Sequence, residues 1–333
     1  MTVRVYTDGR RLALKEGATA AAWIGGDCLF ALGDGSVLIQ GAESAQRIEA
    51  HQGAILCAAL HPDGKSLLTG GDDGRIARTT ANGETEIFSA LGRKWVDHIA
   101  ASSVTGVVVA AQGKEAAVFP AKAREPAHRF VYPSSIGGFA LDAKGRRLAA
   151  SHYGGATIRY VLAAEDSGVK FNWAGSHLAI ALSPDAEFVV TGMQETGLHG
   201  WRIADKLDLR MEGYPSKTRS FSWDRRGKWL ATSGAHCAVV WPFSGKVGPQ
   251  GKSPALLGER QALVTCVAFH PREEWLAMGY ADGAVRLERM ADNFISEIDE
   301  PGEGPVTALA WNADGSKLAI GDAAGRGGIV SIS

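Results

Sequence analysis

Four side chains from the middle of the sequence have the chemistry to bind a metal ion. They are His152, Glu195, His236 and Cys237. Imidazole and thiolate suit zinc, which holds its ligand atoms at about 2.0 to 2.3 Å. The side chains come from separate stretches, however, and their spacing does not show that they converge. Structural or solvent-facing histidines are the alternative that the sequence favours, so we predict no cofactor.

Aromatic and basic residues gather in the same part of the sequence and could form a binding surface. Five of the nine tryptophans lie between residues 171 and 243, beside Tyr214, Lys217 and Arg219. Protein interfaces favour Trp, Tyr and Arg, because these side chains bury a large area and keep a polar group. The alternative is that the tryptophans in β-prone stretches are packing residues, namely Trp201, Trp223 and Trp241.

Two Gly-Lys-Ser triplets raise the question of a phosphate-binding loop. Such a loop needs a glycine five positions before the Gly-Lys pair, but Ala59 and Lys246 stand there. The first triplet, in "HPDGKSLLTGGDDGRI", lies instead between two Asp-Gly pairs, which are strong hairpin signals. The sequence also contains no G-x-S-x-G, HExxH or EF-hand pattern. We therefore predict that the protein is not an enzyme.

Composition limits the range of partners and compartments. Lys plus Arg is 35 and Asp plus Glu is 36, so the net charge of −1 gives no general reason to bind nucleic acid or an anionic membrane. No apolar run approaches the roughly 18 residues that span a bilayer, and "MTVRVYTDGRRLALKEG" lacks a signal-peptide pattern. The four cysteines form no CxxC pair. We expect a soluble, cytoplasmic protein.

A repeat organises the whole sequence. Copies of the same pattern begin near residues 18, 55, 96, 136, 178, 218, 264 and 306, at a period of about 41 residues. Each copy reads as a strand, a polar turn, a buried strand, a Gly-rich turn and a third strand, followed by a fourth β-prone segment. Four strands per unit are typical of one propeller blade. The sequence therefore predicts an all-β propeller that occupies residues 1–333 as one domain.

The number of copies favours eight four-stranded blades, with seven as the alternative. A ring of blades must close, because an open sheet face would expose apolar surface. We expect the closing strand at Arg11–Leu14, at the edge of the blade built from residues 306–333. The segment Val3–Tyr6 competes with Gly328–Ser333 for this edge, and the sequence does not decide between them.

With this repeat, the sequence resembles the WD40-repeat family over essentially its whole length. The resemblance rests on "HPDGKSLLTGGDDGRI", "LSPDAEFVVTG", "LHGWRI", "AVVWPF" and "GYADGAVRL". The motifs are degenerate, since the family's Gly-His is incomplete and no repeat ends in Trp-Asp.

The resemblance implies a hydrogen-bonded set of His, Asp, Ser or Thr, and Trp inside each blade. The second copy supplies His51, Thr69 and Asp73, with Thr79 where Trp is expected. We expect these residues to be structural, since a partly buried polar set must satisfy its own hydrogen bonds. The other copies supply Thr191, Trp201 and Asp282 to such sets, with Trp173 at the histidine position of the fifth copy.

The resemblance also implies that turns after the second strands and loops before the first strands share one face. We predict that this face binds a protein or peptide partner, as on a rigid interaction scaffold. Trp95 and Trp173, in loops between blades, are the favoured surface tryptophans. The candidate rim residues are Lys94, Trp95, His98, Tyr132, His152, Trp173, Tyr214, Lys217, Arg219 and His236.

The alternative function is a metal- or small-molecule-binding propeller, or a hydrolase, that uses the central channel. Propellers do carry such chemistry, but this is an analogy from fold to function. It would require acidic or histidine side chains from at least three blades to converge at the axis.

Overall fold

The strands form because short β-prone runs alternate with turns that only certain residues allow. The structure is a computed structural model that describes residues 6–332. Gly64, in the turn after the first strand of the second repeat, has a φ of 67°, and Gly74, in the next turn, has a φ of 75°. Such left-handed conformations favour glycine. Each pair of turns therefore produces an antiparallel meander around a buried middle strand.

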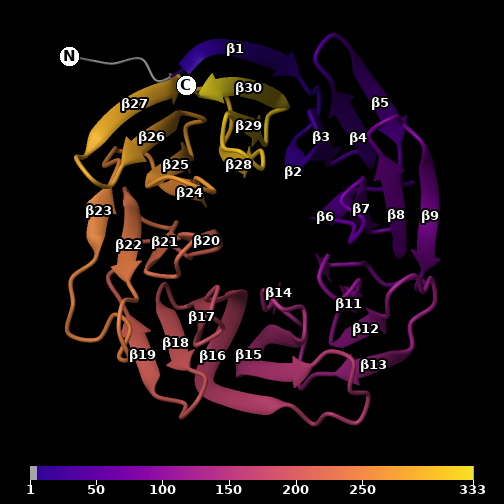
Figure 1. The fold of residues 1–333 in the computed structure, drawn as a ribbon, viewed down its shortest axis with the longest axis vertical. Helices are drawn as coiled ribbons and strands as arrows, with labels where there is room; N and C mark the ends of the chain where they lie inside the picture. The colour runs from indigo at the N-terminus through magenta and orange to yellow at the C-terminus, as the bar shows by residue number, and fades with distance from the viewer. Residues whose placement is uncertain (1–5, 333) are drawn as a thin grey trace.

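The strands pair into seven sheets, which are arranged as blades around a central axis (Figure 1). Three four-stranded sheets come first along the chain: β2 (Ala18–Ile24), β3 (Asp27–Leu32), β4 (Ser36–Gln40) and β5 (Ala45–Glu49); β6 (Ile55–Leu60), β7 (Ser66–Gly71), β8 (Arg75–Thr80) and β9 (Thr85–Ala90); and β10 (His98–Ala101), β11 (Val108–Gln112), β12 (Glu115–Phe119) and β13 (His128–Val131).

The fourth sheet has six strands: β14 (Gly138–Leu141), β15 (Arg147–Tyr160), β16 (Val169–Leu182), β17 (Phe188–Met193), β18 (Leu198–Arg202) and β19 (Asp208–Met211). Two further four-stranded sheets follow: β20 (Phe221–Trp223), β21 (Trp229–Thr232), β22 (Ala238–Pro242) and β23 (Ala255–Leu257); and β24 (Val264–Phe269), β25 (Trp275–Tyr280), β26 (Val285–Arg289) and β27 (Phe294–Asp299).

The prediction of eight separate four-stranded blades is therefore not supported. The structure has seven sheets, which is the number that the alternative prediction gave. The reason is that the repeat copies beginning at residues 136 and 178 share the six-stranded sheet. In that sheet β15 and β16 are each 14 residues long. The first part of β16 pairs with β15 and its second part pairs with β17, so β16 belongs to both copies.

The last sheet brings the two ends of the chain together. It contains β28 (Val306–Trp311), β29 (Lys317–Asp322), β30 (Arg326–Ile332) and β1 (Tyr6–Ala13) in the order β1-β30-β29-β28. Arg11 pairs with Gly328 in this antiparallel register. Of the competing segments, Gly328–Ile332 lies within β30, between β29 and β1. Residues 3–5 and 333 lie outside the described residues.

Apolar clusters fill the space between neighbouring sheets. Between the second and third sheets, for example, Leu68, Ile76 and Phe88 pack with Val96 and Phe119. These side chains are at most 6% exposed, and burying a large apolar side chain contributes about 1.5 to 3 kcal/mol. The sheets therefore form a rigid frame for the loops at their ends.

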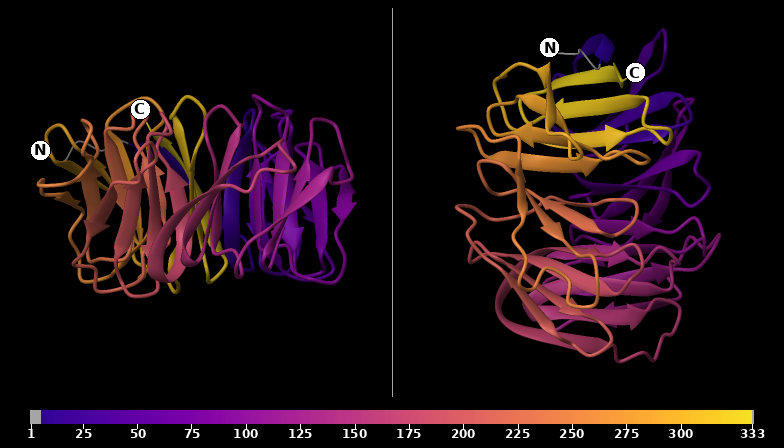
Figure 2. Two further views of the ribbon diagram at one scale, coloured as in Figure 1. Left: turned by 90° about the horizontal axis from the view of Figure 1, so that it is seen from below. Right: turned by 60° about the vertical axis from the view of Figure 1, so that its left-hand side comes forward.

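Successive antiparallel strands give the ring two distinct faces, which Figure 2 shows edge-on. We call one of them the joining face. It carries the loops between sheets, such as residues 91–97, and the turns from second to third strands, such as residues 72–74. The amide of Val96 donates to the carbonyl of Gly71 at 3.0 Å, so these two kinds of loop support each other. The opposite face carries the remaining turns.

Candidate functional site

The loop before β10 presents an exposed tryptophan on the joining face. Trp95 is 61% exposed, whereas the next residue, Val96, is fully buried. The loop is held in place on both sides of the indole: the Gln112 side-chain amide donates to the Lys94 carbonyl at 2.6 Å, and the Asp97 amide donates to the Ala111 carbonyl at 3.0 Å. The Trp95 side chain is therefore exposed to solvent on a backbone that hydrogen bonds hold in place.

Six of the other rim candidates are also at least partly accessible. Lys94, Lys217, Arg219 and His236 are exposed, while Trp173 is half-buried and His98 is half-buried beside Phe139. Burial lowers the pKa of His98, so this side chain is part of a packed environment rather than a free surface group.

Three rim candidates are wrong as surface residues, because their side chains are buried. Tyr132 is 2% exposed, His152 is 5% exposed and Tyr214 is 6% exposed. The guanidinium of Arg159 lies 5.4 Å from the centre of the Tyr132 ring and covers it. The sequence predicted His152 in a turn, but it lies inside β15, and all three side chains are packed against neighbouring residues.

Tyr214 belongs to a buried hydrogen-bonded chain. Its hydroxyl lies 2.7 Å from Thr232 Oγ1 and accepts from Trp241 Nε1 at 2.7 Å. The Thr232 hydroxyl in turn donates to the Val239 carbonyl at 2.8 Å. Tyr214 thus takes the role that histidine has in other repeats, and Trp241 is a packing residue that also satisfies its N–H.

The histidine-centred sets in two other repeats are built in the same way. His51 Nε2 lies 2.9 Å from Thr69 Oγ1, and His51 Nδ1 lies 3.0 Å from Asp73 Oδ1. In the fifth copy His177 Nδ1 lies 2.7 Å from Thr191 Oγ1. The assignment of the histidine position to Trp173 was therefore wrong by four residues.

The remaining two members of these sets, Trp201 and Asp282, contact other side chains. Trp201 is 2% exposed and its ring centre lies 4.6 Å from that of His199. Asp282 accepts from the guanidinium of Arg260 at 3.0 Å. Both therefore stabilise the packing between strands.

The four candidate metal ligands do not form a metal site. Both ring nitrogens of His152 are already in hydrogen bonds, at 2.9 Å from the Tyr153 carbonyl and 2.9 Å from Thr157 Oγ1. His236 Nδ1 donates to the Gln261 carbonyl at 2.7 Å, and burial raises the pKa of the Cys237 thiol. Within residues 6–332 no group of three or more His, Cys, Asp and Glu side chains could hold a metal ion.

A pocket on the joining face brings together Trp173, Glu195 and Tyr214 from the candidate residues. This rim pocket has a volume of about 350 Å³ and lies among β16, β18 and β19, which are neighbours in Figure 1. Sequence reasoning missed two further lining residues, Arg210 and Glu212. Arg210 lies opposite His199 in the β18–β19 register, a pairing that only the structure shows.

Aromatic stacking organises the floor of the rim pocket. The indole of Trp173 lies parallel to the His199 imidazole, with ring centres 4.1 Å apart and 16° between the planes. The Arg210 guanidinium lies 4.2 Å from the Trp173 ring centre. Burial is the main cause that lowers the pKa of His199 to about 4, so this ring is neutral at neutral pH. Trp173 is thus mainly a packing residue with one accessible side.

A second pocket, of about 580 Å³, lies against the inner strands of the ring. It is lined by residues of β16 and β24 and by the segments 219–221 and 305–307. Arg219 and Cys266 are its only ionisable lining residues, and burial is the main cause that raises the pKa of Cys266 to about 12. No Asp, Glu or His among the described residues lines it, so it does not support the alternative of a catalytic or metal site at the channel.

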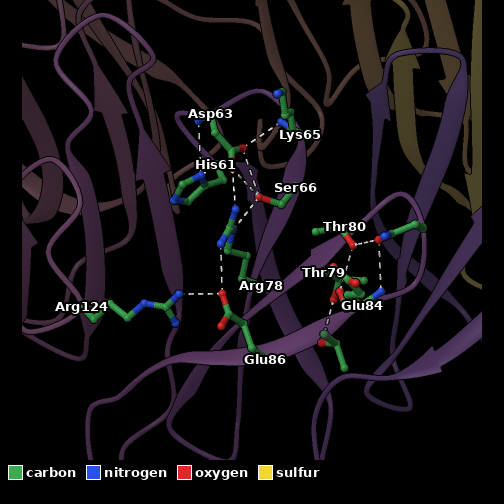
Figure 3. A network of polar contacts seen from close by, with 12 residues as sticks. His61, Asp63, Lys65, Ser66, Arg78, Thr79, Thr80, Glu84, Glu86 and Arg124 are labelled. Carbon is green, nitrogen blue, oxygen red and sulfur yellow. Dashed lines mark hydrogen bonds and ion pairs between the residues drawn. The ribbon is translucent and has the colours of Figure 1, made fainter.

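The Gly-Lys-Ser triplet at residues 64–66 lies on the opposite face, in a polar network that Figure 3 shows. The Lys65 amide donates to Asp63 Oδ1 at 2.8 Å, and the Ser66 hydroxyl donates to the same oxygen at 3.1 Å. Arg78 bridges Asp63 at 2.6 Å and Glu86 at 3.0 Å. These groups satisfy one another, so the triplet is a hairpin turn.

Comparisons with known proteins agree with this fold. A family model described as WD domain, G-beta repeat matches residues 42–77, and one described as Anaphase-promoting complex subunit 4 WD40 domain matches residues 267–333. Among solved structures, the computationally designed Ika8 protein superposes with a TM-score of 0.79 at 16% identity over 98% of both chains, which is a likeness of fold.

Two curated relatives are also similar to the chain. Autophagy-related protein 16 of Arabidopsis thaliana is 25% identical over 84% of the chain, which spans 56% of that protein's length. Periodic tryptophan protein 2 of Saccharomyces cerevisiae is 38% identical over 18% of the chain and 7% of its own length. The described residues contain no helix that is long and apolar enough to cross a membrane. The family-model matches and the propeller fold together show that the chain belongs to the WD40-repeat β-propeller family.

Proposed function

We propose that the protein is a non-enzymatic scaffold that binds a protein or peptide partner on the joining face, with residues 1–333 acting as one propeller domain. The observation that carries this proposal is the 61% exposure of Trp95 on a loop whose backbone is fixed by hydrogen bonds. A cytoplasmic location stays a prediction. The absence of nucleic-acid and membrane partners also stays a prediction, supported by the net charge of −1.

The energetic argument favours Trp95 as an interface residue. A tryptophan buries about 150 to 250 Å² when fully covered, so covering its exposed part removes on the order of 100 Å² from water. At about 25 cal/mol per Å² this contributes roughly 2.5 kcal/mol to association. Because the loop is already ordered, little of that gain is lost as conformational entropy.

The relatives and the pockets are consistent with binding rather than catalysis. Neither relative's name denotes an enzymatic activity. The larger pocket offers apolar side chains and one guanidinium, Arg219, which has no side-chain hydrogen bond or ion pair with the described residues. Apolar surface with one cationic group suits a peptide or protein surface better than a reaction that needs an acid and a base.

Affinity capture from native cell extract tests the proposal. Wild-type protein is compared with Trp95→Ala and with Trp95→Ala/Arg219→Ala. Val104→Ala is a matched control, because Val104 is 70% exposed but lies in the turn between β10 and β11 on the opposite face. We expect capture to be lost in the double variant and kept in the control, with the thermal midpoint nearly unchanged.

Retention of the partner by the double variant would contradict the proposal. Trp173 is left out of the test, although sequence alone made it an attractive surface residue. Its indole stacks on His199, so Trp173→Ala would lower stability as well as any binding. A loss of capture with that variant would not separate the two effects.

A further inference from the structure

Two glutamates give the rim pocket a negative charge. Glu195 and Glu212 line it and are exposed, and neither forms an ion pair or a side-chain hydrogen bond with the described residues. The only cation that lines it, Arg210, has a carboxylate of its own, Asp208, at 3.6 Å. The pocket therefore carries uncompensated negative charge beside an aromatic ring.

The end of the Glu195 side chain lies close to a bend in β16. Gly175, in the bend of β16 after Trp173, has a φ of 118°. A Cβ added there would lie 2.9 Å from Glu195 Oε2, so the side chain of Glu195 lies close against this bend. Glycine is favoured at this position because of the backbone conformation.

The floor of the pocket contains an unpaired polar atom. His199 is 1% exposed, and its Nε2 has no hydrogen-bond partner, with Asp208 Oδ2 at 3.8 Å. A buried nitrogen without a partner costs free energy unless a ligand or water satisfies it. Because the ring is neutral at neutral pH, it adds no positive charge that would oppose a cation.

The chain itself shows which chemical group fits this surface. The Arg210 guanidinium lies over the Trp173 indole at 4.2 Å, which is the geometry of a cation–π contact. A second cation could be held between the indole and the two glutamates, since carboxylates and an aromatic ring both attract positive charge. A phosphate group would instead be repelled by Glu195 and Glu212.

We propose that the rim pocket receives a lysine or arginine side chain from a basic segment of the partner protein, held by Glu195, Glu212 and Trp173. This rests on the proposed function, because it assigns one part of the joining face to one kind of partner side chain. It places a charge-specific contact beside the apolar contact that Trp95 offers.

A titration followed by NMR tests the pocket without the natural partner. The probes are N-acetyl-arginine methylamide and N-acetyl-lysine methylamide, and neutral N-acetyl-norleucine methylamide is the control probe. The signals are the amides of Gly197 and Gly213 and the indole N–H of Trp173, assigned with Trp173→Phe; all three residues line the pocket. We expect saturable shifts with either cationic probe and none with the neutral one.

The carboxylates are tested with paired substitutions. Glu195→Gln/Glu212→Gln should weaken binding of the cationic probes about tenfold, because each exposed charge pair contributes about 0.2 to 1 kcal/mol. Glu165→Gln/Glu187→Gln is the matched control, since both glutamates are exposed and lie outside the pocket. Absence of saturable shifts, equal binding of the neutral probe, or equal weakening by the control pair would overturn the proposal.

The result is independent of the capture experiment. Saturable, charge-dependent shifts would support the pocket even if capture did not depend on Trp95, which would contradict only the proposed role of Trp95. No shifts together with Trp95-dependent capture would overturn the pocket and leave the scaffold proposal standing.

Discussion

Replacing Tyr214 by Phe separates a structural role from a surface role for this residue. The substitution keeps the ring and removes only the hydroxyl, which accepts from Trp241 Nε1 at 2.7 Å and lies 2.7 Å from Thr232 Oγ1. The Thr232 hydroxyl still donates to the Val239 carbonyl. The buried Trp241 N–H, however, loses its acceptor.

The expected cost follows from that lost acceptor. A buried donor left without a partner costs about 1 to 3 kcal/mol, and no cavity term is added because the ring remains. Tyr214→Phe should therefore lower the free energy of unfolding by that amount and leave partner capture unchanged. Thr232→Val removes the other hydroxyl, and the double variant should cost less than the sum of the single ones by about 1 kcal/mol, since the groups act together.

Urea unfolding, followed by both tryptophan fluorescence and circular dichroism, measures these free energies when the two transitions coincide. The slope of free energy against urea should not change between variants. A Tyr214→Phe variant within about 0.5 kcal/mol of the wild type would refute the reasoning, because changes of that size are typical of surface positions.

Two other predictions concern backbone geometry and pH. Gly74→Ala should lower the thermal midpoint much more than Gly64→Ala. Both glycines have positive φ. A Cβ at Gly74, however, would lie 1.9 Å from the Gly92 carbonyl oxygen, whereas a Cβ at Gly64 would meet nothing within 4 Å. Equal losses, each near the roughly 1 kcal/mol of φ strain alone, would show that the close approach has no effect. Stability should also fall as pH falls from 6.5 towards 4, because burial, the main cause, lowers the pKa of His199 from 6.5 to about 4. In this range the unfolded chain binds a proton that the folded chain does not, which costs up to about 3 kcal/mol. His199→Gln should reduce this pH dependence in urea unfolding, and an unchanged dependence would contradict the assignment.

The propeller architecture could be predicted from sequence because turn chemistry repeats with the blades. Asp-Gly pairs and other turn residues at a fixed spacing mark the ends of the strands, as the positive φ values of Gly64 and Gly74 show. The number of sheets could not be predicted in the same way. Sequence marks each repeat copy but does not show that β16 pairs with β15 in one copy and with β17 in the next.

Side-chain direction limited the prediction of the candidate site. Sequence spacing placed His152 in a turn and Tyr132 on the rim, but His152 lies inside β15 and both side chains are buried. Within a strand, a shift of one position decides whether a residue faces solvent or core. The rim pocket depends on contacts between strands, such as that of Arg210 with Trp173, and these have no local sequence signal. Trp95 was predictable as a surface residue because it lies in a loop outside the strand pattern.

Photo-crosslinking tests most directly the central claim that the partner binds the joining face. Benzoylphenylalanine is placed at position 95 in one variant and at position 104 in another, since the two residues lie at opposite ends of β10 and are 61% and 70% exposed. The proposal predicts a crosslink to the captured partner from position 95 and none from position 104. A crosslink from position 104, or none from position 95 with the partner bound, would contradict it.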